Sequence, residues 1–136
     1  MIRPIVHDPL FLARKSEPAT EADRQAAADL LDTLRASLDR CVGMAANMIG
    51  ERKRIIAFCS GPFQTVMFNP RITEGSGEYE TEEGCLSLPG VRKTKRYRRI
   101  TVAYQDQAFR KRTETFEGFT AQIIQHEIDH CDGILI

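Results

Sequence analysis

Apolar residues recur at helical spacing in two separate parts of the chain. Between Glu21 and Leu38, alanines and leucines repeat every three or four residues, as in an amphipathic helix that covers a core. Pro18 and Thr20 precede this stripe and are typical of a helix start. A second stripe lies just before Gly133, a residue that suits the end of a helix. Its members are Phe119, Ile123, Ile124, Ile128 and Cys131.

Short runs of β-branched and aromatic residues occupy the middle of the chain. Residues 55–58 and 66–68 flank Ser-Gly-Pro at 60–62, which predicts two strands paired around a turn. Residues 100–104 and 114–116 predict a second pair, joined by a polar turn over residues 105–112. We therefore expect an α+β fold, a single domain over residues 1–136 in which a mostly antiparallel sheet packs around the last helix.

Composition and charge exclude several classes of protein. The chain has 136 residues, 42% of them hydrophobic, which is enough for one compact core. Its 19 basic and 19 acidic residues cancel, so net charge indicates binding neither to DNA nor to a membrane surface. No apolar run approaches the roughly 20 residues of a membrane span, and the first residues lack the apolar segment of a secretory signal. We predict a cytoplasmic protein.

The most informative motif lies in the last predicted helix, at residues 125–130 (Gln-His-Glu-Ile-Asp-His). A helix stacks the imidazoles of His126 and His130 on one face, because the two residues are four positions apart. Two neutral ring nitrogens can then bind one divalent metal ion, and Glu127 can take a proton from a water on that ion. The motif predicts metal-assisted hydrolysis. The alternative is a surface helix with incidental histidines, and for the isolated His7 we expect a structural role.

A catalytic metal site needs a third protein ligand beside the two histidines. The chain has four cysteines, which are too few and too irregularly spaced for a disulfide scaffold. Cys85 is the best candidate among them, because it follows Gly84, where backbone can come close to a ligand, and precedes a Leu-Pro-Gly turn at residues 88–90.

Residues 83–87 (Glu-Gly-Cys-Leu-Ser) and 125–130 together resemble the peptide deformylase family, whose motifs include E-G-C-L-S and Q-H-E-x-D-H. A third family motif, G-x-G-L-A-A-x-Q, is similar to residues 41–48 (Cys-Val-Gly-Met-Ala-Ala-Asn-Met). The resemblance covers nearly the whole chain. It implies a metal-dependent hydrolase that removes the formyl group from N-formyl-methionyl peptides.

The resemblance also assigns roles to single residues. It implies that Cys85, His126 and His130 hold the metal. Glu127 would act as general base and then as general acid, and the backbone N–H of Leu86 would face the developing oxyanion. The resemblance favours Fe(II), while a thiolate with two imidazoles also accommodates Zn, Ni or Co.

Six residues are implied in binding the peptide. Val42, Gly43 and Gly84 would pair with the peptide backbone in β fashion. Arg92 would meet the C-terminal side of the peptide. Phe119 and Ile123 would line a pocket for the flexible methionine side chain.

The chain departs from the family pattern in its first motif. Met48 stands where the family has the glutamine that stabilises the oxyanion, and a thioether cannot donate a hydrogen bond. Asn47 is a poor substitute, since neighbouring side chains point in different directions. Cys41 replaces a glycine, and Gln122 adds a polar group to an apolar pocket wall. The alternative function is therefore a catalytically silent homologue that binds metal or a modified peptide N-terminus.

Other interpretations rest on single features. Met48 as a fourth, soft ligand would favour copper. A general peptidase of the HExxH type would have only Asp132 as a downstream carboxylate ligand. The basic run from Arg92 to Arg99 would give weak ribosome association, with one of its arginines pairing Asp129, or it is a solvated face. The short tail after Gly133 would leave apolar surface for a homodimer.

Overall fold

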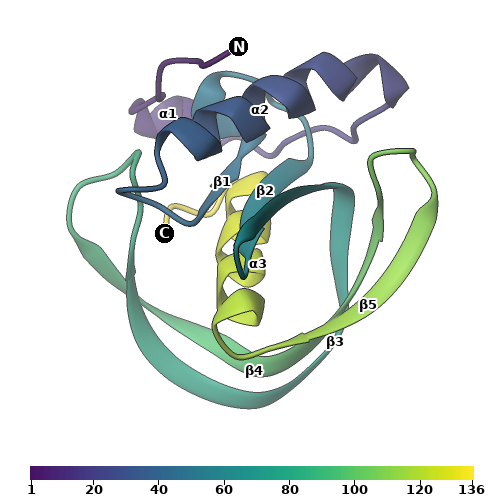
Figure 1. The fold of residues 1–136 in the computed structure, drawn as a ribbon. Helices are drawn as coiled ribbons and strands as arrows, with labels where there is room; N and C mark the ends of the chain where they lie inside the picture. The colour runs from purple at the N-terminus through teal and green to yellow at the C-terminus, as the bar shows by residue number, and fades with distance from the viewer.

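The computed structural model describes residues 1–136 and shows a five-stranded sheet that curls around one helix (Figure 1). All neighbouring strands are antiparallel and follow one another in chain order. The strands are β1 (Gly43–Ala45), β2 (Ile55–Ser60), β3 (Phe63–Gly84), β4 (Val91–Gln105) and β5 (Lys111–Glu117). The α+β fold with its mostly antiparallel sheet is thereby confirmed.

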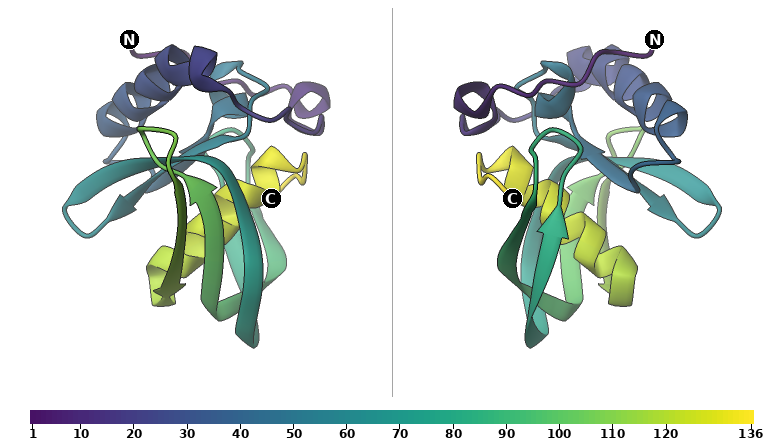
Figure 2. Two further views of the ribbon diagram at one scale, coloured as in Figure 1. Left: turned by 90° about the vertical axis from the view of Figure 1, so that its right-hand side faces the viewer. Right: turned by 90° about the vertical axis from the view of Figure 1, so that its left-hand side faces the viewer.

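Three helices and two short 3-10 turns complete the fold. The helices are α1 (Pro9–Leu12), α2 (Arg24–Ala36) and α3 (Gly118–Cys131), and the 3-10 turns are Glu21–Asp23 and Ala46–Ile49. Figure 2 shows α2 across one end of the sheet and α3 inside the curl formed by β3, β4 and β5. None of these helices has the length and hydropathy needed to cross a membrane.

The alternation of side chains on β2 divides the hydrophobic core into two parts. Ile55 and Ala57 point to the side of α2, and Ile56 and Phe58 point to the side of α3. All four are buried. Because both faces of this strand are covered, its sequence is a continuous apolar run, and burial on both sides fixes α3 against the sheet.

The predicted strand pairs are both present. In the first, Ile55 pairs with Phe68 around a turn at residues 61–62, and in the second, Ile100 pairs with Phe116. The first helix is shorter than predicted, because the chain passes through the 3-10 turn Glu21–Asp23 before α2 begins, and α2 ends before Leu38. The pattern did not predict α1, β1 or the turn Ala46–Ile49, which are too short to show periodicity.

Strands β3 and β4 form a hairpin much longer than the hydrophobic pattern predicts. Residues 71–84 and 91–99 belong to it although most of their side chains are exposed. Glu80 lies opposite Lys95, and Glu82 lies opposite Lys93. Opposite charges facing each other across two strands favour the pairing. The basic run of the sequence is therefore one strand of this hairpin, with acidic residues beside it.

Gly133 ends α3 at a point where no side chain fits. Its φ is +75°, and a Cβ atom built on it would lie 2.5 Å from the carbonyl oxygen of Ala13. The turn after α3 therefore packs directly against the backbone that follows α1. This contact explains why a glycine stands at the end of the metal-motif helix.

Gly133→Ala is expected to lower the free energy of unfolding, measured by chemical denaturation. Gly61→Ala is the matched control, because Gly61 also has a positive φ but has no atom within 4 Å of the added Cβ. The control should lose about 1–2 kcal/mol from backbone strain, and Gly133→Ala should lose about 1–3 kcal/mol more from overpacking. Equal losses in both variants would contradict the contact with Ala13.

Candidate metal centre

Helix α3 presents the two motif histidines side by side. His126 is 8% exposed and His130 is fully buried, and their Nε2 atoms lie 3.1 Å apart. For metal–nitrogen bonds of about 2.0–2.1 Å in a tetrahedral site, two ligating nitrogens lie roughly 3.3 Å apart. The spacing of the two Nε2 atoms therefore fits two ligands of one ion.

Cys85 completes a set of three donors. It follows the last residue of β3, and its Sγ atom and the two histidine nitrogens all lie within 4.8 Å of one another. One thiolate and two imidazoles are a donor set that suits zinc and related transition metals. The three residues predicted from spacing and resemblance are thus brought together at one point and fit a single divalent ion.

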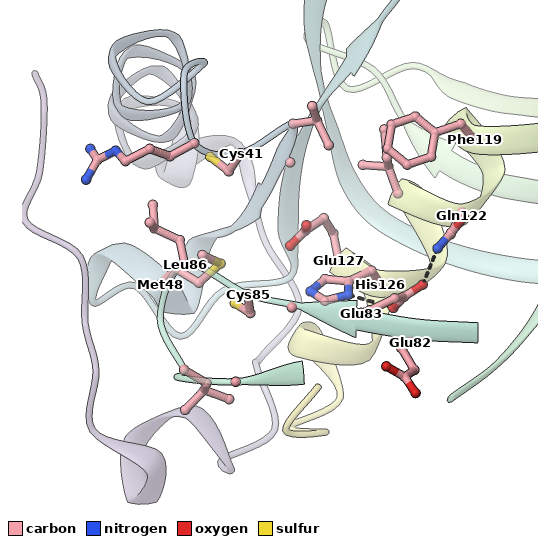
Figure 3. Close-up of a pocket in the computed structure, with 17 residues that line it drawn as sticks. Cys41, Met48, Glu82, Glu83, Cys85, Leu86, Phe119, Gln122, His126 and Glu127 are labelled. Atoms are coloured by element: carbon pink, nitrogen blue, oxygen red, sulfur yellow. Dashed lines mark hydrogen bonds and ion pairs between the residues drawn. The ribbon is translucent and has the colours of Figure 1, made fainter. Parts of the chain in front are cut away.

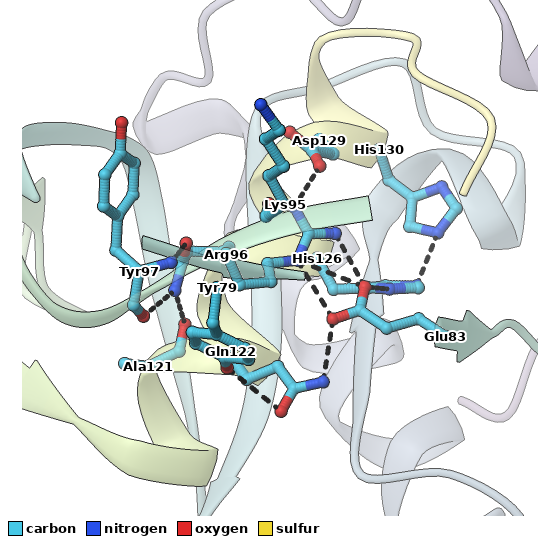
Figure 4. A network of polar contacts seen from close by, with 11 residues as sticks. Tyr79, Glu83, Lys95, Arg96, Tyr97, Ala121, Gln122, His126, Asp129 and His130 are labelled. Atoms are coloured by element: carbon cyan, nitrogen blue, oxygen red, sulfur yellow. Dashed lines mark hydrogen bonds and ion pairs between the residues drawn. The ribbon is translucent and has the colours of Figure 1, made fainter. Parts of the chain in front are cut away.

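A buried carboxylate holds His126 in place, as Figure 4 shows. Glu83 Oε1 accepts a hydrogen bond from His126 Nδ1 at 2.8 Å, which leaves His126 Nε2 free for a metal. Burial acts against the charge on Glu83, but hydrogen bonds from His126, Arg96 and Gln122 outweigh it and lower its pKa to about 2. Glu83 is therefore an ionised group that fixes the orientation of His126.

The partners of Glu83 form a network that extends to β4 and α3. Arg96 is 4% exposed and donates to both Glu83 oxygens, with its Nη2 2.6 Å from Oε1. Its Nη1 donates to Asp129 at 2.7 Å, so an arginine of the basic run does pair Asp129. Gln122 Nε2 donates to Glu83 at 2.9 Å, and Gln122 Oε1 accepts from the Tyr79 hydroxyl at 3.3 Å. The polar group of Gln122 thus belongs to this network.

The two histidines differ in their environment. Burial acts against a charge on His126, but hydrogen bonds to Cys85 and Glu83 outweigh it and raise the pKa of His126 to about 10. Burial and the neighbouring charge of His126 lower the pKa of His130 to about 3. Without a metal ion, His126 therefore carries a proton on Nε2 that faces the neutral His130, and an ion bound to both Nε2 atoms would displace this proton.

Glu127 lies beside the cluster of Cys85, His126 and His130 and is not part of it. It is 4% exposed, and its Oε1 atom has no hydrogen-bond partner in the protein. Burial raises the pKa of Glu127 to about 7. A carboxyl group with such a pKa can both accept and return a proton near neutral pH.

A cavity of about 600 Å³ opens over these groups, and most of the predicted site residues line it (Figure 3). Arg92 and His130 are the exceptions. Arg92 lies at the start of β4, outside the lining, and its Nη1 donates to the carbonyl oxygen of Pro89 at 3.4 Å. His130 is fully buried and does not line the cavity. The predicted residues that do line it are Val42, Gly43, Gly84, Cys85, Leu86, Phe119, Ile123, His126 and Glu127.

The first motif forms one wall of the cavity. Cys41 and Met48 both line it, and Figure 3 shows them on the side opposite Phe119 and Gln122. Burial and the nearby Glu127 raise the pKa of Cys41 to about 11, so Cys41 is a neutral thiol. Met48 is 1% exposed, and its Sδ accepts from the Ala45 N–H at 3.5 Å. Both side chains are wall residues, and neither belongs to the three-ligand cluster.

Sequence reasoning did not find every residue of the site. Glu83 and Arg96 act through His126, and Arg40 and Glu82 line the outer part of the cavity. A strand prediction that reached Gly84 could have found Glu83, because alternation places residues 83 and 85 on the same face of a strand. No local signal marks Arg40, which reaches the cavity only through the fold.

A cysteine and two histidines beside a buried glutamate, at the base of a cavity, are the donor set of a mononuclear metallohydrolase. Comparison with known proteins identifies which one. The family model of polypeptide deformylase matches residues 2–136. The peptide deformylase of Clostridium beijerinckii is 58% identical over the full length of both chains. That of Dictyoglomus thermophilum is 40% identical, covering 100% of this chain and 91% of the relative.

Solved structures with a similar fold are also peptide deformylases. The crystal structure of peptide deformylase from Thermotoga maritima has a TM-score of 0.88 at 30% identity, covering 99% of this chain and 95% of that one. The Met-Ala-Ser-bound class I type b peptide deformylase from Acinetobacter baumannii has a TM-score of 0.88 at 30% identity, covering 99% and 97%. The chain therefore belongs to the peptide deformylase family, metallohydrolases that act on N-formyl peptides.

Cys85→Ala and His130→Ala are each expected to abolish stoichiometric metal binding, measured by elemental analysis of the purified protein. Each removes one of three donors, and catalytic metal sites rarely survive with two. Cys59→Ala is the control, because Cys59 is a half-buried free thiol outside the cluster. Full metal content in either ligand variant would exclude the site drawn here.

Proposed function

We propose that the chain removes formyl groups from N-formyl-methionyl peptides at a metal ion held by Cys85, His126 and His130. The observation that carries this is the convergence of the three donor atoms with a buried glutamate, Glu127, at the base of one cavity. When bound, the divalent ion would lower the pKa of a water molecule and polarise the formyl oxygen. We propose Fe(II) as the native ion, and the same donors also accommodate Zn, Ni or Co.

Glu127 would carry the proton in both halves of the reaction. It takes a proton from the attacking water as the new bond to the formyl carbon forms, and it gives that proton to the nitrogen as the carbon–nitrogen bond breaks. The products are formate and a peptide with a free amino group. Burial raises the pKa of Glu127, and the charge of a bound ion would act in the opposite direction, favouring the carboxylate that accepts the proton.

The backbone N–H of Leu86 would stabilise the developing negative charge on the formyl oxygen. Leu86 lines the cavity next to Cys85, and its N–H donates to no acceptor within the protein. A free backbone donor beside the reacting carbonyl is the usual arrangement of an oxyanion hole. Residue 48 would be the second donor if it were a glutamine.

The substrate peptide would add to the unpaired edge of β1 at Gly43, which lines the cavity. This strand lies at the end of the sheet and pairs only with β2, so its other edge is free. A Cβ atom at Gly43 would lie 2.7 Å from the Ile123 side chain and 2.8 Å from the Glu127 side chain. Only a glycine therefore allows β1 to lie this close to α3. The related Acinetobacter baumannii enzyme binds Met-Ala-Ser, which supports a peptide with a first methionine here.

The methionine side chain would lie between Phe119 and Ile123 on α3. Both line the cavity, and Phe119 is 64% exposed, so the ring is available for contact with a ligand. The amide of Gln122, which also lines this wall, is occupied by Glu83 and Tyr79. A flexible thioether fills such a partly polar pocket readily.

Three further expectations concern the partners of the chain and the place where it acts. Ribosome association through residues 92–99 would have to use side chains that face acidic partners, because Lys93 and Lys95 lie opposite Glu82 and Glu80. A homodimer through the C-terminal region would use Ile134, which is 47% exposed. We propose the cytoplasm as the place of action, since N-terminal formyl groups are removed where chains are made.

A catalytically silent homologue is the second candidate. The observation that favours it is the position of Met48, buried in the cavity wall with a sulfur atom that can accept but cannot donate. Loss of one oxyanion donor typically costs about 10²–10³ in kcat, roughly 3–4 kcal/mol. Formate release by the metal-loaded protein from formyl-Met-Ala-Ser decides between the two candidates.

Glu127→Gln should reduce formate release by about 10²–10⁴-fold, because the amide keeps the shape of the side chain and cannot move the proton. Metal content should stay at the wild-type level, since Glu127 is not a ligand. Glu74→Gln, an exposed change on β3, serves as the control and should leave both quantities unchanged. Wild-type turnover in Glu127→Gln would show that another group is the base.

Met48→Gln should raise kcat/KM on formyl-methionyl peptides by about 10-fold or more, within the ~10²–10³ that one donor contributes. The gain should lie mainly in kcat, because the donor acts on charge that develops in the transition state. Met48→Leu is the matched control, since it repacks the same site without a donor. An equal rate in wild type, Met48→Gln and Met48→Leu would mean that Leu86 or another group already supplies the stabilisation.

A further inference from the structure

The two metal-binding histidines are not supported equally. His126 donates its Nδ1–H to Glu83 at 2.8 Å, whereas the Nδ1 atom of His130 is buried and has no partner in the protein. A ligating histidine almost always donates its second ring N–H to a carboxylate, an amide or carbonyl oxygen, or a water. When Nε2 of His130 binds a metal, its Nδ1 carries a proton that needs an acceptor.

Asn47 lies directly against His130. This residue is fully buried in the 3-10 turn Ala46–Ile49, and its Nδ2 donates to the backbone oxygen of His130 at 3.0 Å. The other half of the same amide, Oδ1, is also buried and has no partner in the protein. An unpaired acceptor and an unpaired donor on two residues in contact are each costly unless they satisfy each other.

We propose that Asn47 is a positioning residue for the metal ligand His130, with Nδ2 fixing its backbone oxygen and Oδ1 accepting its Nδ1–H, directly or through one water molecule. The inference rests on the proposed metal site. It gives each ligating histidine an oxygen acceptor on another element, Glu83 on β3 for His126 and Asn47 for His130. Asn47, which cannot replace the missing oxyanion donor, then has a role of its own.

Two other readings of Asn47 can be separated from this one. As a simple helix cap, Asn47 would matter only for stability, but the His130 oxygen also accepts from the Gly133 N–H at 3.1 Å and has a partner without it. The second reading gives the acceptor role to Ser87, whose Oγ is also buried and unpaired. Asn47 is favoured because it already holds the same residue by a hydrogen bond.

The test is the affinity for Zn²⁺ and Co²⁺, measured by competition with a chelator on the full chain, together with the unfolding midpoint of the metal-free protein. Asn47→Leu keeps the shape and removes both hydrogen bonds, and Asn47→Ala admits water if the first variant does not fold. Thr33→Val is the matched control, since Thr33 is 2% exposed on α2, and its Oγ1 donates to the Asp29 oxygen and accepts from the Arg3 N–H, away from the cluster of Cys85, His126 and His130.

The Asn47 variants should lose about 10–100-fold in metal affinity, whereas Thr33→Val should lower the unfolding midpoint and leave the affinity unchanged. The absorption of the Co²⁺ form should also change only in the Asn47 variants. Wild-type affinity in a folded Asn47 variant overturns the proposal, as does a loss confined to Ser87→Ala. Failure of the wild-type chain to bind metal through Cys85 would instead overturn the proposed function.

One measurement needs no variant. In the Zn²⁺-loaded wild-type protein, the Nδ1 proton of His130 should be protected from exchange with solvent and should show a nuclear Overhauser effect to the Asn47 side-chain amide. A protected proton that shows this effect to Ser87 instead, or a proton in rapid exchange, overturns the proposal even if both Asn47 variants fail to fold.

Discussion

The buried carboxylate of Glu83 is the group on which the arrangement of the site depends. It lies on β3 and accepts hydrogen bonds from Arg96 on β4 and from Gln122 and His126 on α3. A buried charge of this kind is tolerated only when every partner is present, and removing one leaves an uncompensated charge. One side chain therefore ties the long hairpin to α3 and orients His126 at the same time.

The fold could be predicted where burial imposes a period on the sequence. The apolar stripes of α2 and α3 and the apolar runs of β2 and β4 follow from a core that covers them. The outer half of the β3–β4 hairpin could not, because residues 71–84 expose most of their side chains and carry no apolar alternation. There the strands depend on backbone pairing and on facing charges such as Glu80 and Lys95, which become visible only once the register is known.

The same division holds for the site. The cluster of Cys85, His126 and His130 could be predicted from the sequence because the helix repeat fixes the two histidines on one face, and because a thiol after Gly84 is a natural third donor. Their supports could not be named, since Arg96 and Gln122 reach Glu83 only through the fold of the sheet around α3. Local motifs contain the residues that supply donor atoms, whereas tertiary contacts bring in the groups that orient those residues.

Residue 48 differs from the partners of Glu83 in the property that its replacement would change. Glu83 compensates charges that exist in the resting protein, so its partners are needed for the fold of the site itself. An oxyanion donor acts only on charge that develops during the reaction, and the resting protein loses nothing without it. Met48 accordingly packs in the core beside α2 and accepts a hydrogen bond from Ala45. The fold and the cluster of Cys85, His126 and His130 can therefore persist while this one position changes, and under the proposed mechanism its effect falls on the rate alone.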